Sequence, residues 1–211
     1  MFDEIALKYG TDKSSEWHNY GPVYDKIFQN IREQVNTFVE IGIAGGKSLK
    51  TWAEFLPNAI ITGVDIQQHC EVYKDLPKID TIIGDINKEE TIQRLPEEID
   101  VCVDDGSHEY NHQIYAFEKI FPRIKPGGLF ICEDVSTSYF DGIWRVSGPI
   151  SFSNYCKQLV DDINFRGIRE NMGRNTQKLI EEANSEPHLK MRVDIESIAF
   201  YNSIIVIEKR K

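Results

Sequence analysis

The feature that most constrains the fold is an alternation of short apolar runs, rich in Val and Ile, with longer segments of helical periodicity. This alternation is typical of βαβ units, in which helices connect parallel strands. We predict five strands, at Thr37–Ile41, Ile60–Asp65, Thr81–Ile83, Val101–Asp104 and Leu129–Cys132. Apolar side chains recur every three or four residues in three segments between them, which we predict as helices: Ser48–Leu56, Lys88–Leu95 and Tyr110–Ile124.

The C-terminal part of the chain adds a different strand pattern. Pro126-Gly127-Gly128 is expected to end the last of these helices before the fifth strand. Two apolar runs, Ile198–Tyr201 and Ile204–Ile207, flank Asn202-Ser203 and predict a hairpin. The sequence therefore predicts an α/β fold with a mostly parallel, Rossmann-like sheet, helices on both faces and a C-terminal antiparallel hairpin.

Length and charge exclude several classes of protein. The 211 residues suit one domain, and 24 basic against 34 acidic side chains give a net charge of −10, so we expect no nucleic-acid partner. No apolar run approaches the ~20 residues of a membrane-spanning helix, and Met1–Glu4 lacks the cationic start of a signal peptide. We therefore expect a cytoplasmic protein without a membrane partner. The four cysteines show no C-x-x-C spacing, which argues against a zinc site or a disulfide framework.

We expect residues 1–211 to form a single domain, with residues 1–36 as an N-terminal helical cap. Residues 135–190 contain several glycines within weak helical patterning, and we predict a substrate lid there. The aromatic side chains of Phe140–Trp144 and Tyr155 could form an apolar wall for an acceptor. Ordinary helix packing is the alternative for these aromatic residues.

A glycine-rich turn follows the first predicted strand, in Val39–Ser48. Glycines allow the backbone to approach a ligand, although the spacing matches neither a phosphate loop nor G-x-G-x-x-G, and a simple tight turn is the alternative. Asp65 ends the second strand, where a carboxylate can accept hydrogen bonds from both ribose hydroxyls of an adenosine. Asp85 ends the third strand and could contact the adenine amino group. For both aspartates a structural cap is the alternative.

Acidic residues also follow the fourth and fifth strands, in Val103–Glu109 and Ile131–Asp134. If these strands are neighbours, a cation must offset the repulsion between the carboxylates, and oxygen ligands favour Mg²⁺. Successive strand residues point to opposite sides, so Asp104 and Asp105 should divide between the cofactor and the metal. His108 could remove a proton from a substrate held there. The alternative is that this segment only caps the following helix.

Five stretches of the sequence together resemble a known enzyme family. They are Tyr9–Lys13 with Trp17–Tyr20, Val39–Leu49, Asp104–Gln113, Lys125–Gly128 and Glu133–Tyr139. In them the chain resembles the class I S-adenosylmethionine-dependent methyltransferases, and more narrowly the Mg²⁺-dependent O-methyltransferases that modify sugars of macrolide antibiotics. The resemblance implies Asp105 and Asp134 as metal ligands and His108 as the general base. It implies a cofactor site lined by Glu40, Gly42, Gly46, Ser48, Asp65, Asp85 and Asp104, with Tyr20 or Lys13 near the methionine end.

The expected function is therefore S-adenosylmethionine- and Mg²⁺-dependent methylation of a hydroxyl on a sugar, in a glycosylated natural product or a polysaccharide precursor. The expected partner is this small-molecule acceptor, and a homo-oligomer is compatible with the sequence. Three alternatives stay open: a catechol-like or other small hydroxylated or phosphorylated acceptor, a nicotinamide-dependent oxidoreductase, and a non-catalytic binding module.

Overall fold

The computed structural model describes residues 1–70, 77–139, 150–171, 178 and 194–211. It divides into two compact units, Met1–Ser107 and His108–Lys211. Among the described residues, no helix is long and apolar enough to cross a membrane. The segment Phe140–Trp144, predicted as part of an acceptor wall, lies outside the described residues.

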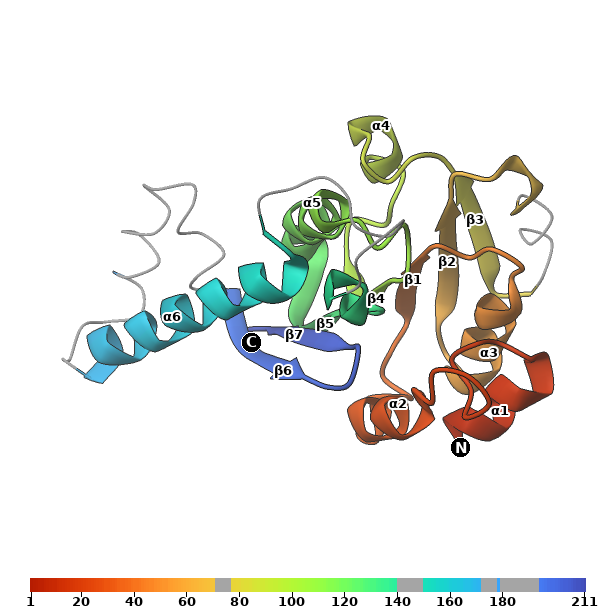
Figure 1. The fold of residues 1–211 in the computed structure, drawn as a ribbon, viewed down its shortest axis with the longest axis horizontal. Helices are drawn as coiled ribbons and strands as arrows, with labels where there is room; N and C mark the ends of the chain where they lie inside the picture. The colour runs from red at the N-terminus through yellow and green to blue at the C-terminus, as the bar shows by residue number, and fades with distance from the viewer. Residues whose placement is uncertain (71–76, 140–149, 172–177, 179–193) are drawn as a thin grey trace. The chain divides into compact units, whose positions relative to one another are not determined.

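The first unit contains four parallel strands, which lie in the order β3-β2-β1-β4. They are β1 (Thr37–Ile41), β2 (Ile60–Asp65), β3 (Ile79–Ile83) and β4 (Ile99–Asp104). Four helices accompany them: α1 (Phe2–Tyr9), α2 (Gly21–Phe28), α3 (Lys47–Phe55) and α4 (Glu89–Ile92). Figure 1 shows α1, α2 and α3 grouped near one end of β1 and β2. The predicted βαβ pattern is confirmed, with β1 and β2 at the predicted bounds.

Strands β1 and β3 are followed by helices α3 and α4, which return the chain to the edge at which the strands begin. Thr37 pairs with Ile60, and Phe38 pairs with Val101 on the other side of β1. This register brings the carboxyl ends of β1, β2 and β4 to one edge. The loops that leave this edge carry the glycine-rich turn and the first acidic residues of the predicted site.

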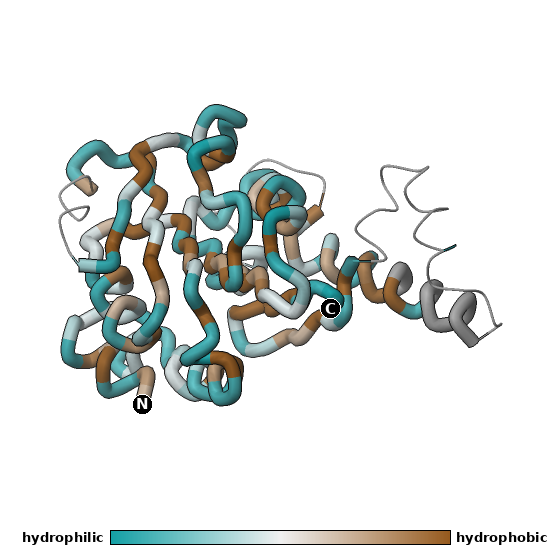
Figure 2. The backbone as a smooth tube through the Cα atoms, turned by 180° about the vertical axis from the view of Figure 1, so that it is seen from behind, coloured by the Kyte–Doolittle hydropathy of each residue, from teal (hydrophilic) through white to brown (hydrophobic). Residues whose placement is uncertain are grey.

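An aromatic cluster forms the core between the helices and β1 in this unit. Trp52 of α3 is fully buried and its ring lies 4.7 to 4.9 Å from those of Phe2, Tyr24 and Phe38. Such contacts stabilise both by area burial and by ring geometry. The N-terminal segment is thereby packed onto α3, which fixes residues 10–20 beside the glycine-rich turn. Figure 2 shows the hydrophobic residues concentrated in the strands and alternating with polar residues in the helices.

The second unit contains α5 (Tyr110–Ile120), β5 (Ile124–Cys132), α6 (Phe152–Asn171), β6 (Ile195–Phe200) and β7 (Ile205–Lys209), with short 3₁₀ helices η2 (Phe121–Arg123) and η3 (Val135–Tyr139). Strand β7 pairs antiparallel with both β5 and β6, so the predicted hairpin is confirmed. Pro126–Gly128 was predicted to lie before the fifth strand, but in the structure it lies within β5. The chain enters β5 directly after η2, and the helix has already ended at Ile120.

The region predicted as an irregular lid contains a long helix in its described part. Helix α6 continues through Gly167 to Asn171. Tyr155 of this helix stacks on Phe152 and lies edge-on to Phe117. These contacts fit the alternative of ordinary helix packing for Tyr155.

Candidate active site

The glycine-rich turn after β1 approaches the end of β4 very closely. Gly42 has φ +81°, and a Cβ atom there would lie 2.0 Å from the backbone oxygen of Asp105. The amide of Asp105 in turn donates to the backbone oxygen of Ile41. Only glycine fits at position 42, because any side chain would overlap a backbone atom that cannot rotate away. Gly46, also at positive φ, is the N-cap of α3 and ends the turn.

Asp65, at the end of β2, holds this turn in place. Its Oδ2 atom accepts hydrogen bonds from the amides of Ile43 and Ala44 at 3.0 Å each, and its Oδ1 atom accepts one from the amide of Gln67 at 2.8 Å. A charged acceptor makes such bonds stronger than neutral ones. Asp65 therefore fixes the direction in which the turn leaves β1.

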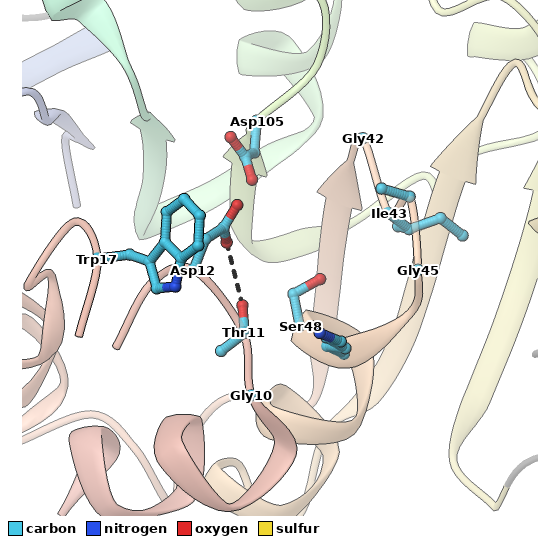
Figure 3. A pocket seen from close by; sticks show the side chains of 11 residues that line it. Gly10, Thr11, Asp12, Trp17, Gly42, Ile43, Gly45, Ser48 and Asp105 are labelled. Carbon is cyan, nitrogen blue, oxygen red and sulfur yellow. Dashed lines mark hydrogen bonds between the residues drawn. The ribbon is translucent and has the colours of Figure 1, made fainter. Parts of the chain in front are cut away.

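A cavity of about 250 Å³ lies against the turn (Figure 3). Its lining includes Gly42, Ser48 and Asp105, three of the residues predicted for the site. The remaining lining comes from the turn and from the N-terminal segment: Gly10, Thr11, Asp12, Trp17, Ile43, Ala44, Gly45 and Lys47. Figure 3 shows Asp12 and Trp17 facing the turn from the opposite wall. Asp12, Trp17 and Lys47 were not predicted as lining residues, although the stretch Tyr9–Lys13 was a signal for this segment.

Two buried charged residues, Lys13 and Glu40, contact residues of the cavity wall. The ammonium of Lys13, which is 1% exposed, lies 2.5 Å from Asp105 Oδ2 and 3.7 Å from Glu40 Oε1. Glu40 accepts hydrogen bonds from Ser48 Oγ at 2.8 Å and from Trp52 Nε1 at 2.9 Å. Burial raises the pKa of Glu40 to about 7, against the opposing effect of Lys13. Glu40 thus orients Ser48, and Lys13 orients Asp105.

Asp104 and Asp105 have different environments. Asp104 is buried, and its Oδ1 atom accepts a hydrogen bond from the Gly106 amide at 3.2 Å. Its Oδ2 atom has no hydrogen-bond partner among the described residues. Burial raises the pKa of Asp104 to about 7. Asp105 instead reaches the cavity and the Lys13 ammonium.

Six of the eight residues predicted at the cofactor site are not among the residues that line this cavity: Tyr20, Glu40, Gly46, Asp65, Asp85 and Asp104. Tyr20 is 2% exposed and its ring stacks on His18 and lies edge-on to Tyr24. Asp85 accepts hydrogen bonds from the backbone and side-chain amides of Asn87. The contacts of Asp85 are those of a turn-stabilising aspartate.

In the second unit, His108 and Asp134 lie close together. His108 Nε2 is 3.8 Å from Asp134 Oδ2, and both residues adopt positive φ, at 61° and 54°. The backbone oxygen of Asp134 accepts hydrogen bonds from the amide and hydroxyl of Thr137 at the start of η3. Positive φ is uncommon for residues other than glycine, and it concentrates where a side chain must point in a required direction.

Comparison with known proteins shows similarity to methyltransferases. Residues 39–135 match the family model described as a methyltransferase domain. A tetracenomycin-C rhamnosyl 2'-O-methyltransferase of Streptomyces olivaceus is 34% identical over 191 residues, which cover 82% of this chain and 48% of that protein. Mycinamicin VI 2''-O-methyltransferase of Micromonospora griseorubida is 31% identical over 220 residues, covering 98% and 52%. This chain therefore spans about half the length of these relatives.

A solved structure of the mycinamicin pathway methyltransferase MycE, in complex with Mg and SAH, matches 100% of this chain and 53% of that chain, at 28% identity and a TM-score of 0.80. A second MycE structure, which also holds the macrolide mycinamycin VI, matches with a TM-score of 0.78. The full-length match confirms the predicted fold class. The chain thus carries a methyltransferase domain with the class I fold and resembles the O-methyltransferases that act on sugars of macrolides and tetracenomycins.

Proposed function

We propose that this chain is an S-adenosylmethionine- and Mg²⁺-dependent O-methyltransferase that acts on a hydroxyl of a sugar, in a glycosylated natural product or a polysaccharide precursor. The observation that carries the proposal is the cavity between the glycine-rich turn and the N-terminal segment, with Asp105 in its wall. The sugar O-methyltransferase activities of the relatives support the acceptor class, and the Mg and SAH of the MycE structures support the cofactors.

For the cofactor, Gly42 and Ser48 are proposed to line the site directly, with Glu40 and Gly46 shaping the wall and turn. Asp65 is proposed to accept hydrogen bonds from the ribose hydroxyls. A carboxylate oxygen can accept more than one hydrogen bond, so the amides that Asp65 already binds are compatible with this role. Contacts of Asp85, Asp104 and Tyr20 with the cofactor stay proposals that rest on the resemblance.

For the metal, Asp105 and Asp134 are the proposed ligands. The chemistry of the donors fits, because carboxylate oxygens are the ligands that Mg²⁺ prefers. The contact of the Asp105 carboxylate with a cation, the ammonium of Lys13, supports a position that suits a positive partner. When bound, Mg²⁺ would lower the pKa of an acceptor hydroxyl.

His108 is proposed as the general base. Its Nε2 atom would take the hydroxyl proton while the acceptor oxygen gains the methyl group, and S-adenosylhomocysteine would leave as a neutral thioether. Asp134 Oδ2, at 3.8 Å from this nitrogen, would stabilise the imidazolium that forms. The proposed lid at residues 135–190, the cytoplasmic location and a homo-oligomer stay predictions.

The test is turnover of the purified protein with S-adenosylmethionine and Mg²⁺ on a panel of sugars, glycosides and catechols, measured as release of S-adenosylhomocysteine. We expect turnover on a sugar hydroxyl, lost in excess EDTA and restored by Mg²⁺. Methylation of catechols alone would favour the aromatic acceptor. Full turnover in excess EDTA would contradict the metal requirement.

Two variants locate the metal. Asp105→Asn and Asp134→Asn should each abolish turnover and leave the affinity for S-adenosylhomocysteine nearly unchanged, because the metal is proposed to contact the acceptor. The exposed Asp80 offers a matched control, and Asp80→Asn should leave turnover unchanged. Retained turnover in the Asp105 and Asp134 variants would exclude them as ligands.

A further inference from the structure

The cavity carries charges of both signs. Three of its lining residues are charged: Asp12, Lys47 and Asp105. The charge of Asp105 is matched by the ammonium of Lys13 at 2.5 Å. Within the part of the chain that the structure describes, neither Asp12 nor Lys47 forms an ion pair with another side chain. One carboxylate and one ammonium on this wall are therefore available to a ligand.

These two side chains line the same cavity. Lys47 is the first residue of α3, and its Nζ atom lies 3.8 Å from where a Cβ atom of Gly10 would be. The ammonium thus reaches the N-terminal segment two residues before Asp12. The hydroxyl of Thr11, a buried residue, donates to Asp12 Oδ1 at 3.2 Å and orients that carboxylate (Figure 3).

The size of the cavity limits what this pair can bind. Sites for whole drug-sized ligands usually measure roughly 300–1,000 Å³, whereas this cavity measures about 250 Å³. It therefore suits one end of a larger ligand. A small group that carries both a positive and a negative charge matches its two available side chains.

We propose that Asp12 and Lys47 bind the amino-acid end of the methyl donor, with the Asp12 carboxylate accepting hydrogen bonds from the α-ammonium group and Lys47 pairing with the α-carboxylate. This inference rests on the proposed function. It gives the methionine end a pair of residues other than Lys13 and Tyr20, whose side chains are 1% and 2% exposed. Lys13 keeps a supporting role through Asp105.

The test uses ligand analogues that each lack one charge. Calorimetry would measure the affinities of S-adenosylhomocysteine, its decarboxylated analogue and its deaminated analogue for the wild type and two variants. Loss of a charge-assisted contact lowers the affinity about tenfold or more. Lys47→Met should lower the affinity for S-adenosylhomocysteine by that factor and leave the affinity for the decarboxylated analogue within about twofold of the wild-type value. Asp12→Asn should lower the affinity for S-adenosylhomocysteine by the same factor and leave the affinity for the deaminated analogue unchanged.

Two exposed neighbours provide matched controls: Lys50, on the same helix as Lys47, and Glu16, in the same segment as Asp12. Lys50→Met and Glu16→Gln should bind all three ligands as the wild type does. Equal losses for every analogue, or an unchanged affinity for S-adenosylhomocysteine in both variants, would overturn the inference and leave the proposed function standing. A wild-type protein that binds none of the three ligands would overturn both.

Discussion

Replacement of Gly42 by alanine tests the contact that shapes the site. The residue has φ +81°, and its new Cβ atom would lie 2.0 Å from the backbone oxygen of Asp105 and 2.9 Å from the Cα atom of Gly106. These atoms belong to the backbone at the end of β4, so no side-chain rotation relieves the overlap. Either the turn after β1 or the chain after β4 must move.

The expected loss of stability has two parts. The left-handed backbone conformation costs a non-glycine residue about 1–2 kcal/mol. Overpacking in a well-packed region typically adds about 1–3 kcal/mol. We therefore expect Gly42→Ala to lower the free energy of unfolding by about 2–5 kcal/mol, because the two effects act on the same residue through different atoms.

Urea denaturation followed by tryptophan fluorescence would measure the free energy of unfolding, since Trp52 is fully buried in the core of the first unit. Gly45 offers a matched control, because a Cβ atom there would meet nothing within 4 Å and its φ is not positive. Gly45→Ala should change the free energy of unfolding by less than about 1 kcal/mol. Equal stability of the two variants would refute the close approach of the turn to β4. The Gly42 variant should also bind S-adenosylhomocysteine more weakly, since the glycine-rich turn that lines the cavity would be displaced.

Three further predictions concern single side chains. Asp65→Ala should weaken S-adenosylhomocysteine binding in calorimetry and lower the free energy of unfolding by about 1–3 kcal/mol, because three backbone amides lose a charged acceptor. Unchanged stability would mean that Asp65 does not hold the turn. His108→Ala should lower kcat roughly 100-fold to 10,000-fold, the usual contribution of one general base. His112→Ala should have little effect on kcat, because His112 lies in the first turn of α5 and its Nε2 atom is 3.7 Å from Glu109. Similar losses in the two variants would exclude His108 as the base. Burial raises the pKa of the Cys70 thiol to about 11 and raises that of Cys156 as well, so the thiolate fraction at pH 8 is reduced. A thiol reagent at pH 8 should label these cysteines slowly in the native protein and quickly in urea, and equal rates would contradict their burial.

The sequence by itself determined the fold class and the edge of the sheet at which the site lies. The short apolar runs between helical segments located β1 and β2 at their observed bounds, because a strand that is buried on both faces is mostly apolar along its length. The acidic residues after the fourth predicted strand indicated Asp105, and the resemblance to a known family implied Gly42 and Ser48; all three line the cavity. Local patterns suffice here, because strand direction and turn chemistry are set by neighbouring residues.

Only the tertiary structure decided which side chains meet across the chain. Asp12 and Lys47 lie 35 positions apart in the sequence, and the packing of α1 and α2 on Trp52 brings the N-terminal segment to the glycine-rich turn. The same packing buries Lys13 between Asp105 and Glu40, where it supports the wall. Such contacts depend on how helices pack on the sheet, and no local periodicity encodes them.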